Sequence, residues 1–172
     1  YTRSLIKTSG KPALLINDIV PNPDFELLSR QAKLYSQVKD KPEVIVALGG
    51  GSVIDSAKVF AAAGNGFEKI KKFLETKNGG QGLSSTPIIA VPSTSGTGSE
   101  VTCWATVWDK KNNHKYSLAH KKLFPEIAII DPKLMIEKPY ELTLVTALDA
   151  LSHALESIWN INANTISSNH AT

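Results

Sequence analysis

Asp149 and His153, in the stretch ALDALSHALES, have side chains that could bind one metal ion together. They stand four residues apart, and on a helix this spacing places both side chains on the same face. A carboxylate oxygen and an imidazole nitrogen are typical ligands of Fe²⁺ and Zn²⁺. Because two protein ligands are too few for a tight site, an exposed Asp/His pair on a helix surface is the alternative interpretation.

The residues around this pair favour the metal interpretation. Apolar side chains occupy much of the circumference of the predicted helix: Leu148, Leu151, Leu155, Ile158 and Trp159. We therefore expect the helix to be largely buried. A buried carboxylate needs a partner, and a metal ion would be a sufficient one.

A glycine-rich turn follows the apolar run EVIVAL of residues 43–48. In GGGSVIDSAK, Gly50 and Gly51 precede Ser52, a candidate N-cap, and Asp55 follows three residues later. Glycine lets the backbone approach a ligand, and the N–H groups and dipole of a helix N-terminus favour an anion. The turn predicts a pyrophosphate site. A strand-to-helix turn can also need glycine for its conformation alone, and this one matches neither G-x-G-x-x-G nor Walker A.

A second polar loop, PSTSGTGSE, follows the apolar run TPIIAVP of residues 86–92. Its hydroxyl groups suit contacts with phosphate, ribose or amide, and they come from Ser93, Thr94, Ser95, Thr97 and Ser99. Open α/β sheets bind ligands at the carboxyl ends of their strands, where both loops would lie. A plain surface connection is the alternative. Two such loops at one edge predict a dinucleotide site.

The elements that must position these residues alternate between strand and helix. Apolar runs predict strands over residues 13–19, 43–48, 86–92 and 126–131, with helices after the first two, and residues 101–120 form a hairpin around KKNN. Strands without polar alternation indicate a parallel sheet covered on both faces. We predict a Rossmann-like α/β domain over residues 1–139 with a hairpin insertion. Residues 140–172 would begin an all-helical domain, with a long helix from about residue 140 to 161.

The composition excludes several other classes of protein. The chain has 172 residues, a net charge of +3 and a hydrophobic share of 42%, which is ordinary for a globular domain. Lysines cluster at residues 69–77 without interleaved aromatic residues, so we expect a solvated helix face and no nucleic-acid site. No apolar run is long enough to span a membrane. The lone Cys103 fits a reducing compartment, so a cytoplasmic location is expected.

Four motifs together resemble the iron-containing, group III, alcohol dehydrogenase family. They are ALGGGSVIDSAK, PSTSGTGSEVT, IIDP and ALDALSHALES, in that order, and the similarity extends from about Ala13 to Trp159. The resemblance implies an N-terminal nucleotide-binding α/β domain and a C-terminal all-helical domain, with a catalytic metal between them. It also implies hydride transfer between NAD or NADP and a small alcohol or aldehyde, and a homodimer.

The resemblance assigns roles to residues of the first loop and the hairpin. Gly50, Gly51 and Ser52 match positions that hold the cofactor pyrophosphate, and Asp55 matches one near the nicotinamide. Lys115, in the predicted hairpin, matches a basic residue that contacts the nucleotide.

Further cofactor positions are implied outside this loop. Ser93, Thr94 and Thr97 match the second cofactor loop, where the family more often has threonine at the position of Ser93. Asn22, in VPNP, and Leu134 match residues near the adenosine end.

The implied metal site is incomplete. Asp149 and His153 match the first two protein ligands of the family metal, Fe²⁺ or Zn²⁺, whereas the other two are histidines expected beyond residue 172. His170 is too close in sequence to His153 to replace either one. The family's first strand, with the acidic residue that selects NAD over NADP, is expected before Tyr1. We therefore expect the chain to be a fragment that is inactive alone.

Three functional interpretations remain open at this point. KYSLAHKKLFPEIAIIDP followed by ALDALSHALESIWNINAN is similar to the phosphonoacetaldehyde reductase subgroup, and its lysines would suit a phosphonate or the cofactor phosphates. A lyase of the dehydroquinate synthase type, which uses NAD and zinc, is a rival from the same superfamily. A non-catalytic nucleotide-binding fragment is a rival from another class.

Overall fold

A computed structural model describes residues 12–40, 42–64 and 66–172. The helices are α2 (Phe25–Ser36), α3 (Gly51–Ala63), α4 (Phe67–Thr76), α5 (Tyr140–Trp159) and α6 (Thr165–Ala171). The strands are β1 (Ile45–Gly49), β2 (Ile88–Pro92), β3 (Trp104–Asp109), β4 (His114–Ala119) and β5 (Ile127–Ala128). Four short 3₁₀ turns complete the described elements: η1 (Gly80–Gly82), η2 (Ser99–Val101), η3 (Lys121–Leu123) and η4 (Pro132–Leu134).

Strands β1, β2 and β5 form a parallel sheet in the order β1-β2-β5, with Ile45 paired to Ile88 and Ile89 to Ile127. β3 and β4 form a separate antiparallel hairpin. The predictions of a parallel sheet, α/β class and hairpin insertion are confirmed. β5 is shorter than the predicted strand of residues 126–131, and Asp131 caps the turn η4 that follows.

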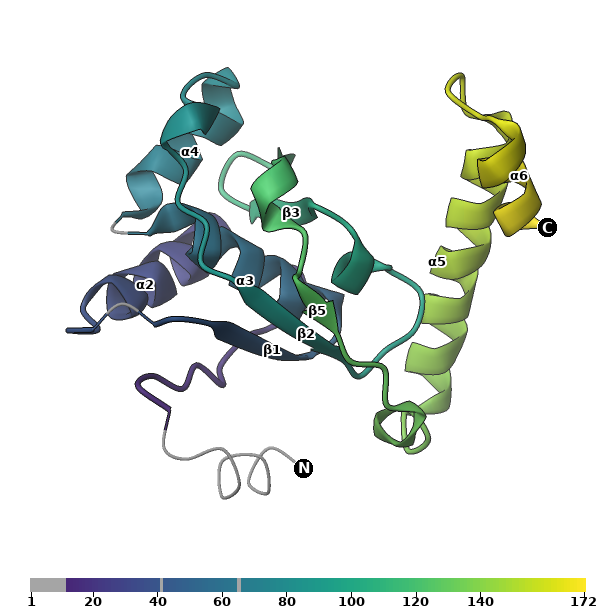
Figure 1. The fold of residues 1–172 in the computed structure, drawn as a ribbon, viewed down its shortest axis with the longest axis horizontal. Helices are drawn as coiled ribbons and strands as arrows, with labels where there is room; N and C mark the ends of the chain where they lie inside the picture. The colour runs from purple at the N-terminus through teal and green to yellow at the C-terminus, as the bar shows by residue number, and fades with distance from the viewer. Residues whose placement is uncertain (1–11, 41, 65) are drawn as a thin grey trace.

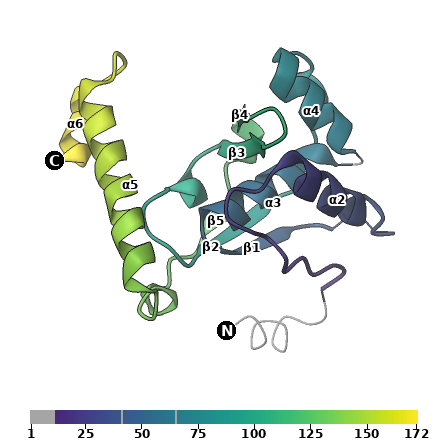
Figure 2. The ribbon, with the colours of Figure 1, turned by 180° about the vertical axis from the view of Figure 1, so that it is seen from behind.

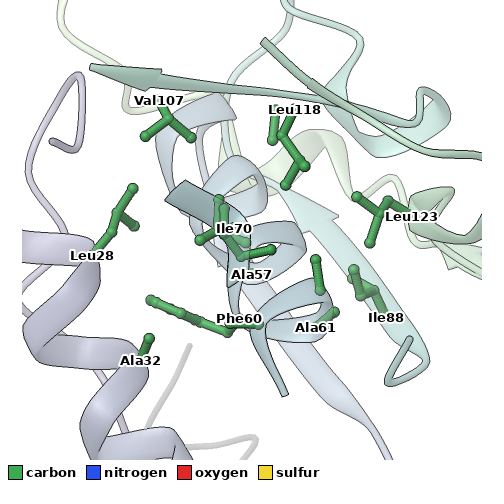
Figure 3. Close-up of a cluster of buried hydrophobic side chains, with 14 of the residues drawn as sticks. Leu28, Ala32, Ala57, Phe60, Ala61, Ile70, Ile88, Val107, Leu118 and Leu123 are labelled. Atoms are coloured by element: carbon green, nitrogen blue, oxygen red, sulfur yellow. The ribbon is translucent and has the colours of Figure 1, made fainter. Parts of the chain in front are cut away.

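The core lies around α3, which packs between the sheet and the hairpin (Figure 1). Every residue of α3 from Ser56 to Ala63 is buried, as expected for a helix surrounded by other elements. Figure 3 shows side chains of α2, α3, α4, the sheet and the hairpin meeting in one cluster. Full burial of a side chain such as Ile54 contributes roughly 1.5 to 3 kcal/mol. This core fixes the sheet edge where the two glycine loops lie.

The two faces of the sheet differ in cover. Ala47, Ile88 and Ala90 are buried on the side of α3. On the opposite face, Val46 and Ile127 are 57% and 51% exposed, because no described element covers them fully. The helices that pack onto this sheet, in the described ranges, therefore lie on one side of it (Figures 1 and 2).

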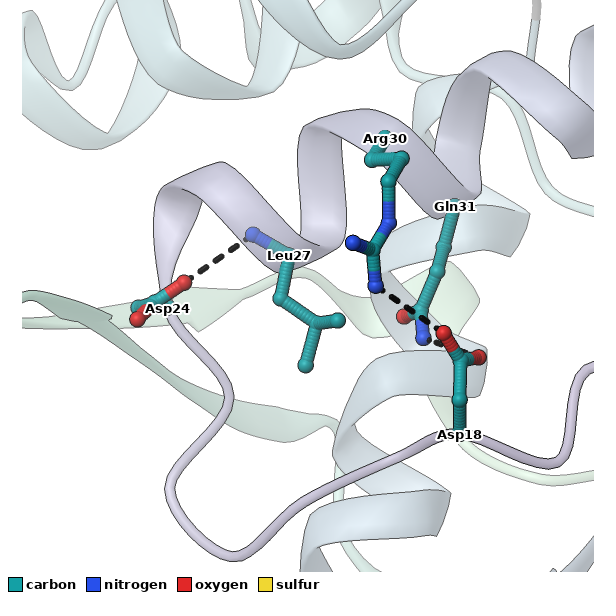
Figure 4. A network of polar contacts seen from close by, with 5 residues as sticks. All are labelled: Asp18, Asp24, Leu27, Arg30 and Gln31. Atoms are coloured by element: carbon teal, nitrogen blue, oxygen red, sulfur yellow. Dashed lines mark hydrogen bonds and ion pairs between the residues drawn. The ribbon is translucent and has the colours of Figure 1, made fainter.

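The strand predicted for residues 13–19 is wrong. Residues 14–20 form no helix and belong to no strand ladder. Instead the carboxylate of Asp18 accepts hydrogen bonds from Arg30 Nη2 at 3.0 Å and Gln31 Nε2 at 2.7 Å, as Figure 4 shows. Side-chain bonds to α2 hold the segment in place, and a neighbouring strand is not needed.

The expected burial of the late helix is also wrong for this chain. α5 spans Tyr140–Trp159, near the predicted limits, but Leu148 and Leu151 are 55% and 54% exposed. Figures 1 and 2 show α5 at the opposite end of the molecule from α2 and α4. Its apolar residues are exposed because the described elements do not cover them.

Candidate functional site

The two glycine-rich loops meet at the carboxyl ends of β1 and β2. Register pairs Gly49 with Pro92, so the strands end side by side. The backbone N–H of Ser93 then donates to the carbonyl of Gly49 at 3.0 Å, which joins the first residues of the two loops. The parallel sheet thus brings together two segments more than forty residues apart in sequence.

Side chains of the second loop lie directly over the glycines of the first. A Cβ atom on Gly50 would lie 3.2 Å from Thr94 Oγ1, and one on Gly51 would lie 2.8 Å from Thr97 Cγ2. The second distance is shorter than real Cβ contacts allow. A larger residue at Gly51 would therefore force the Thr97 side chain to move, and the backbone of Gly51 lies close to the hydroxyl group of Thr97.

The N-terminus of α3 is suited to an anion. Gly50 is its N-cap and offers no side-chain capping bond, and the first turn carries no acidic residue. A helix N-terminus without these partners presents N–H groups and a positive dipole end. The described residues therefore leave this end to a ligand or to water. The loop chemistry fits a phosphate group.

Asn22 and Ser52 lie together at one side of this turn. The backbone N–H of Asn22 donates to Ser52 Oγ at 3.2 Å. Asn22 has a left-handed backbone with φ of 55°, a conformation that asparagine tolerates better than most residues. The hydroxyl group of Ser52 thus fixes the VPNP turn beside α3, so two residues expected near the cofactor are neighbours.

Asp55 lies inside the protein and is already hydrogen-bonded. Its carboxylate accepts from Ser99 Oγ at 2.6 Å and from the backbone N–H of Thr106 at 2.8 Å. Burial raises the pKa of Asp55, and the bonds from Ser99 and Thr106 oppose that rise. In this arrangement Asp55 links α3 to the second loop and to β3.

Lys58 is a site-supporting residue that sequence reasoning missed. Its ammonium group is fully buried and donates to Ser99 O and Trp104 O, both at 2.7 Å, and to Ser99 Oγ at 2.9 Å. Burial lowers the pKa of Lys58 from 10.5 to about 8, and the nearby carboxylate of Asp55 partly offsets this change. A signal was present in the sequence, since a lysine in AKVFAAA interrupts a helix that is otherwise apolar.

Lys115 and Leu134 are less directly placed. Lys115 Nζ lies 5.6 Å from the centre of the Trp108 ring, and its charge is one of the smaller effects that oppose the rise in the pKa of Asp55 caused by burial. Leu134 ends η4 and its N–H donates to Asp131 O; no hydrogen bond recorded in the described ranges joins Leu134 to either loop.

Asp149 and His153 face each other on α5. Asp149 Oδ1 lies 3.8 Å from His153 Nε2, and the side chains are 41% and 53% exposed. One cation could contact both groups from solvent. Within the described ranges, no cluster of three or more His, Cys, Asp or Glu side chains could hold a metal ion. The pair fits two ligand positions of a metal site and needs further ligands to complete it.

The parallel sheet, its crossover helices and the loops at its carboxyl edge define an α/β protein of the Rossmann-like class. Comparison with known proteins is more specific. The family model described as iron-containing alcohol dehydrogenase matches residues 1–132. The chain belongs to the iron-containing alcohol dehydrogenase family.

Individual relatives agree with this assignment. The chain is 33% identical to the choline dehydrogenase of Bacillus subtilis and 35% identical to the NADPH-dependent butanol dehydrogenase of Clostridium saccharobutylicum, covering 88% of this chain in both cases. Sulfoacetaldehyde reductase from Bifidobacterium kashiwanohense, solved in complex with NAD⁺, has a TM-score of 0.88 at 32% identity over 99% of this chain and 45% of that one. The aligned region spans only 37% and 39% of the two curated relatives.

The described helices of the protein differ from membrane-spanning helices. In the part of the chain that the structure describes, none is both long and apolar enough to cross a bilayer.

Proposed function

We propose that this chain supplies the nucleotide-binding part and two metal ligands of a metal-dependent oxidoreductase. The reaction is hydride transfer between NAD or NADP and a small alcohol or aldehyde. The observation that carries the proposal is the contact of Thr94 and Thr97 with Gly50 and Gly51 at the N-terminus of α3. This arrangement presents backbone N–H groups and hydroxyl groups to one anionic ligand.

Each group has a defined task in the proposed site. Gly50, Gly51 and Ser52 bind the pyrophosphate through the end of α3, and Thr97 adds a hydroxyl group from the second loop. Lys115 contributes positive charge from β4. Asp55 holds the second loop through Ser99, and so positions cofactor contacts without needing to be exposed.

Further contacts extend the cofactor site along the same edge. Ser93 and Thr94 are proposed as cofactor contacts from the start of the second loop, and Asn22 and Leu134 as contacts near the adenosine end. Asn22 is supported by its bond to Ser52, whereas the role of Leu134 rests on the family resemblance alone.

Asp149 and His153 are proposed as ligands of a divalent cation, Fe²⁺ or Zn²⁺. When bound, the nicotinamide carries the hydride and the cation supplies Lewis acidity to the substrate oxygen. The chain's own contribution is to hold the carboxylate and the imidazole on one face of α5. Further ligands would come from outside the described residues, because these offer no third partner for the pair.

The substrate class is proposed from similarity. The relatives include proteins named for butanol, choline and sulfoacetaldehyde, and the last is a short aldehyde with an anionic sulfonate group. Phosphonoacetaldehyde has the same plan with a phosphonate. We therefore propose a short aldehyde, with phosphonoacetaldehyde as the first candidate. NAD and NADP both stay open, since the relatives include a protein solved with NAD⁺ and one named for NADPH.

Nucleotide binding is tested on this chain by isothermal titration with NAD⁺ and NADP⁺. Gly51→Val is expected to abolish binding, because its side chain would overlap Thr97. The matched control is Gly82→Ala, since a Cβ at Gly82 meets no atom within 4 Å. Equal affinity of both variants would contradict the proposed cofactor site.

Catalysis is tested on the full-length protein with Fe²⁺ or Zn²⁺, NADH or NADPH, and a panel of short aldehydes that includes phosphonoacetaldehyde. Turnover that is lost in Asp149→Asn and His153→Ala is the expected result. Nucleotide binding without turnover would favour a non-catalytic nucleotide-binding protein, the second candidate. NAD-dependent elimination from an acidic substrate would instead indicate the lyase type.

We also propose that the full-length protein is a homodimer of the cytoplasm. The family resemblance supports the dimer, and a sequence with Cys103 as its single cysteine suits a reducing compartment. Sedimentation velocity of the full-length protein tests the dimer, and a monomer at micromolar concentration would overturn it.

A further inference from the structure

The second glycine loop contacts α5 as well as the first loop. A Cβ atom built on Gly96 would overlap the carbonyl oxygen of Thr146 and lie 3.0 Å from its carbonyl carbon. Both atoms belong to the backbone of α5, which cannot turn aside as a flexible side chain can. Gly96 therefore permits a close approach that a larger residue would prevent.

Thr146 is a point at which α5 meets the second loop. In a helix that the structure describes throughout its length, Thr146 alone is buried. Its hydroxyl group accepts a bond from Lys138 Nζ at 2.9 Å, which fixes the first turns of α5 to the segment before them. Asp149 and His153 follow three and seven residues later on the same helix. The position of Thr146 against Gly96 therefore determines where Asp149 and His153 lie.

The other side of the second loop is anchored in the core. Lys58 binds Ser99 O and Trp104 O, and Asp55 binds the hydroxyl group of Ser99. These buried bonds hold the loop to α3, whose N-terminus carries the first glycine loop. At Gly96, α5 therefore contacts a loop that buried hydrogen bonds hold in place.

We propose that Gly96 is a positioning residue, whose missing side chain lets the backbone of Thr146 seat against the second loop and so sets the placement of Asp149 and His153 relative to the cofactor loops. The docking itself rests only on the contacts that Thr146 makes with Gly96 and Lys138. Its consequence for a metal rests on the proposed function.

The docking is tested by distance measurement between paired spin labels. Cysteines replace Glu68 on α4 and Glu156 on α5, both exposed, in a Cys103→Ser background. Gly96→Ala is expected to shift and broaden the distance distribution. Gly98→Ala is the control for replacing a glycine of positive φ in the same loop: φ is 61° at Gly98 and 142° at Gly96, and a Cβ at Gly98 meets only Val101, at 4.0 Å. A distribution unchanged in Gly96→Ala overturns the inference.

A second variant keeps the test decisive if Gly96→Ala does not fold, as judged by circular dichroism. Lys138→Met removes the bond to Thr146 without any overlap. Because it releases the first turns of α5, it should broaden the same distribution in a folded protein. An unchanged distribution in this folded variant then overturns the inference.

The consequence for the metal is measured separately in the full-length protein by Co²⁺ absorption titration. Gly96→Ala should weaken metal binding about 10- to 100-fold, the range found when groups that orient metal ligands are altered. A shifted distance distribution with unchanged Co²⁺ affinity supports the docking but counts against Asp149 and His153 as ligands. Failure of the docking and failure of the proposed metal site therefore give different results.

Discussion

At the scale of single residues, Lys58 shows how a buried charge can organise a binding loop. Its ammonium group has several acceptors, and two of these are backbone carbonyls of the segment Ser99–Trp104. Taking this charge out of water is costly, so the bonds are needed to hold it there. In return, the loop over the first glycine turn is fixed from within the core.

Replacing Lys58 by methionine should destabilise the chain by about 3 kcal/mol, because the carbonyls of Ser99 and Trp104 lose their buried donor. Urea unfolding at neutral pH measures the loss. Lys69→Met, on the exposed face of α4, is the control and should change the free energy of unfolding by less than about 0.5 kcal/mol. Similar values for both variants would show that the bonds of Lys58 contribute little.

The lowered pKa of Lys58 predicts a pH dependence. Below pH 8 the folded and unfolded chains both hold the proton, whereas between the folded pKa of about 8 and 10.5 the unfolded chain binds it more. The free energy of unfolding contributed by this group therefore rises with pH across that window. The difference between wild type and Lys58→Met should grow from about pH 7.5 to about pH 9.5 in urea melts. A constant difference would contradict the shift.

At the scale of elements, Asp24 links the start of α2 to the hairpin. One carboxylate oxygen accepts from the N–H of Leu27 at 3.0 Å as an N-cap, and the other lies 3.2 Å from Lys110 Nζ (Figure 4 draws the cap). The N–H of Trp108 donates to Pro23 O in the same turn. The VPNP turn is therefore held between two elements, and its Asn22 reaches the first glycine loop.

Asp24→Ala should cost about 1 kcal/mol at pH 7, the usual value of an N-cap. The bond from Leu27 lowers the pKa of Asp24 from 3.8, with Lys110 adding to the effect. The stability that this carboxylate contributes is therefore present above pH 3.8 and is lost as the pH falls through the folded pKa. Thermal melts of both proteins should converge in acid. Asp24→Asn, which retains a capping oxygen, should lose less at neutral pH.

At the scale of the whole molecule, stability resides in the α/β part. The core cluster includes residues of α2, α3, α4, the sheet and the hairpin, whereas α5 contributes none of them. Its apolar side chains, such as Leu151, lie largely in solvent. In the described ranges, contacts with the second loop and with α6 hold α5 in position.

Two leucine-to-alanine substitutions test this division. Leu118→Ala, at a fully buried position of β4, should cost roughly 2 to 5 kcal/mol. Leu151→Ala, at a side chain 54% exposed, should change the free energy of unfolding of this chain by less than about 0.5 kcal/mol. Both values come from chemical denaturation. A large loss in Leu151→Ala would mean that α5 is covered in solution.

The sequence by itself determined the local elements and the residue types of the site. Uninterrupted apolar runs predicted β1 and β2, and the glycines and hydroxyls after them predicted where ligand loops would lie, because these signals depend on neighbours in sequence. The four-residue spacing likewise placed Asp149 beside His153.

Only the tertiary structure decided which distant groups meet. Residues 13–19 have strand-like composition but pair with no strand in the part of the chain that the structure describes, and Asp18 instead accepts bonds from two side chains of α2. The packing of loops and helices decides three features of the site. Lys58 is buried, Thr97 lies over Gly51, and Thr146 contacts Gly96. Burial and close approach are properties of three-dimensional neighbours, which spacing along one chain cannot specify.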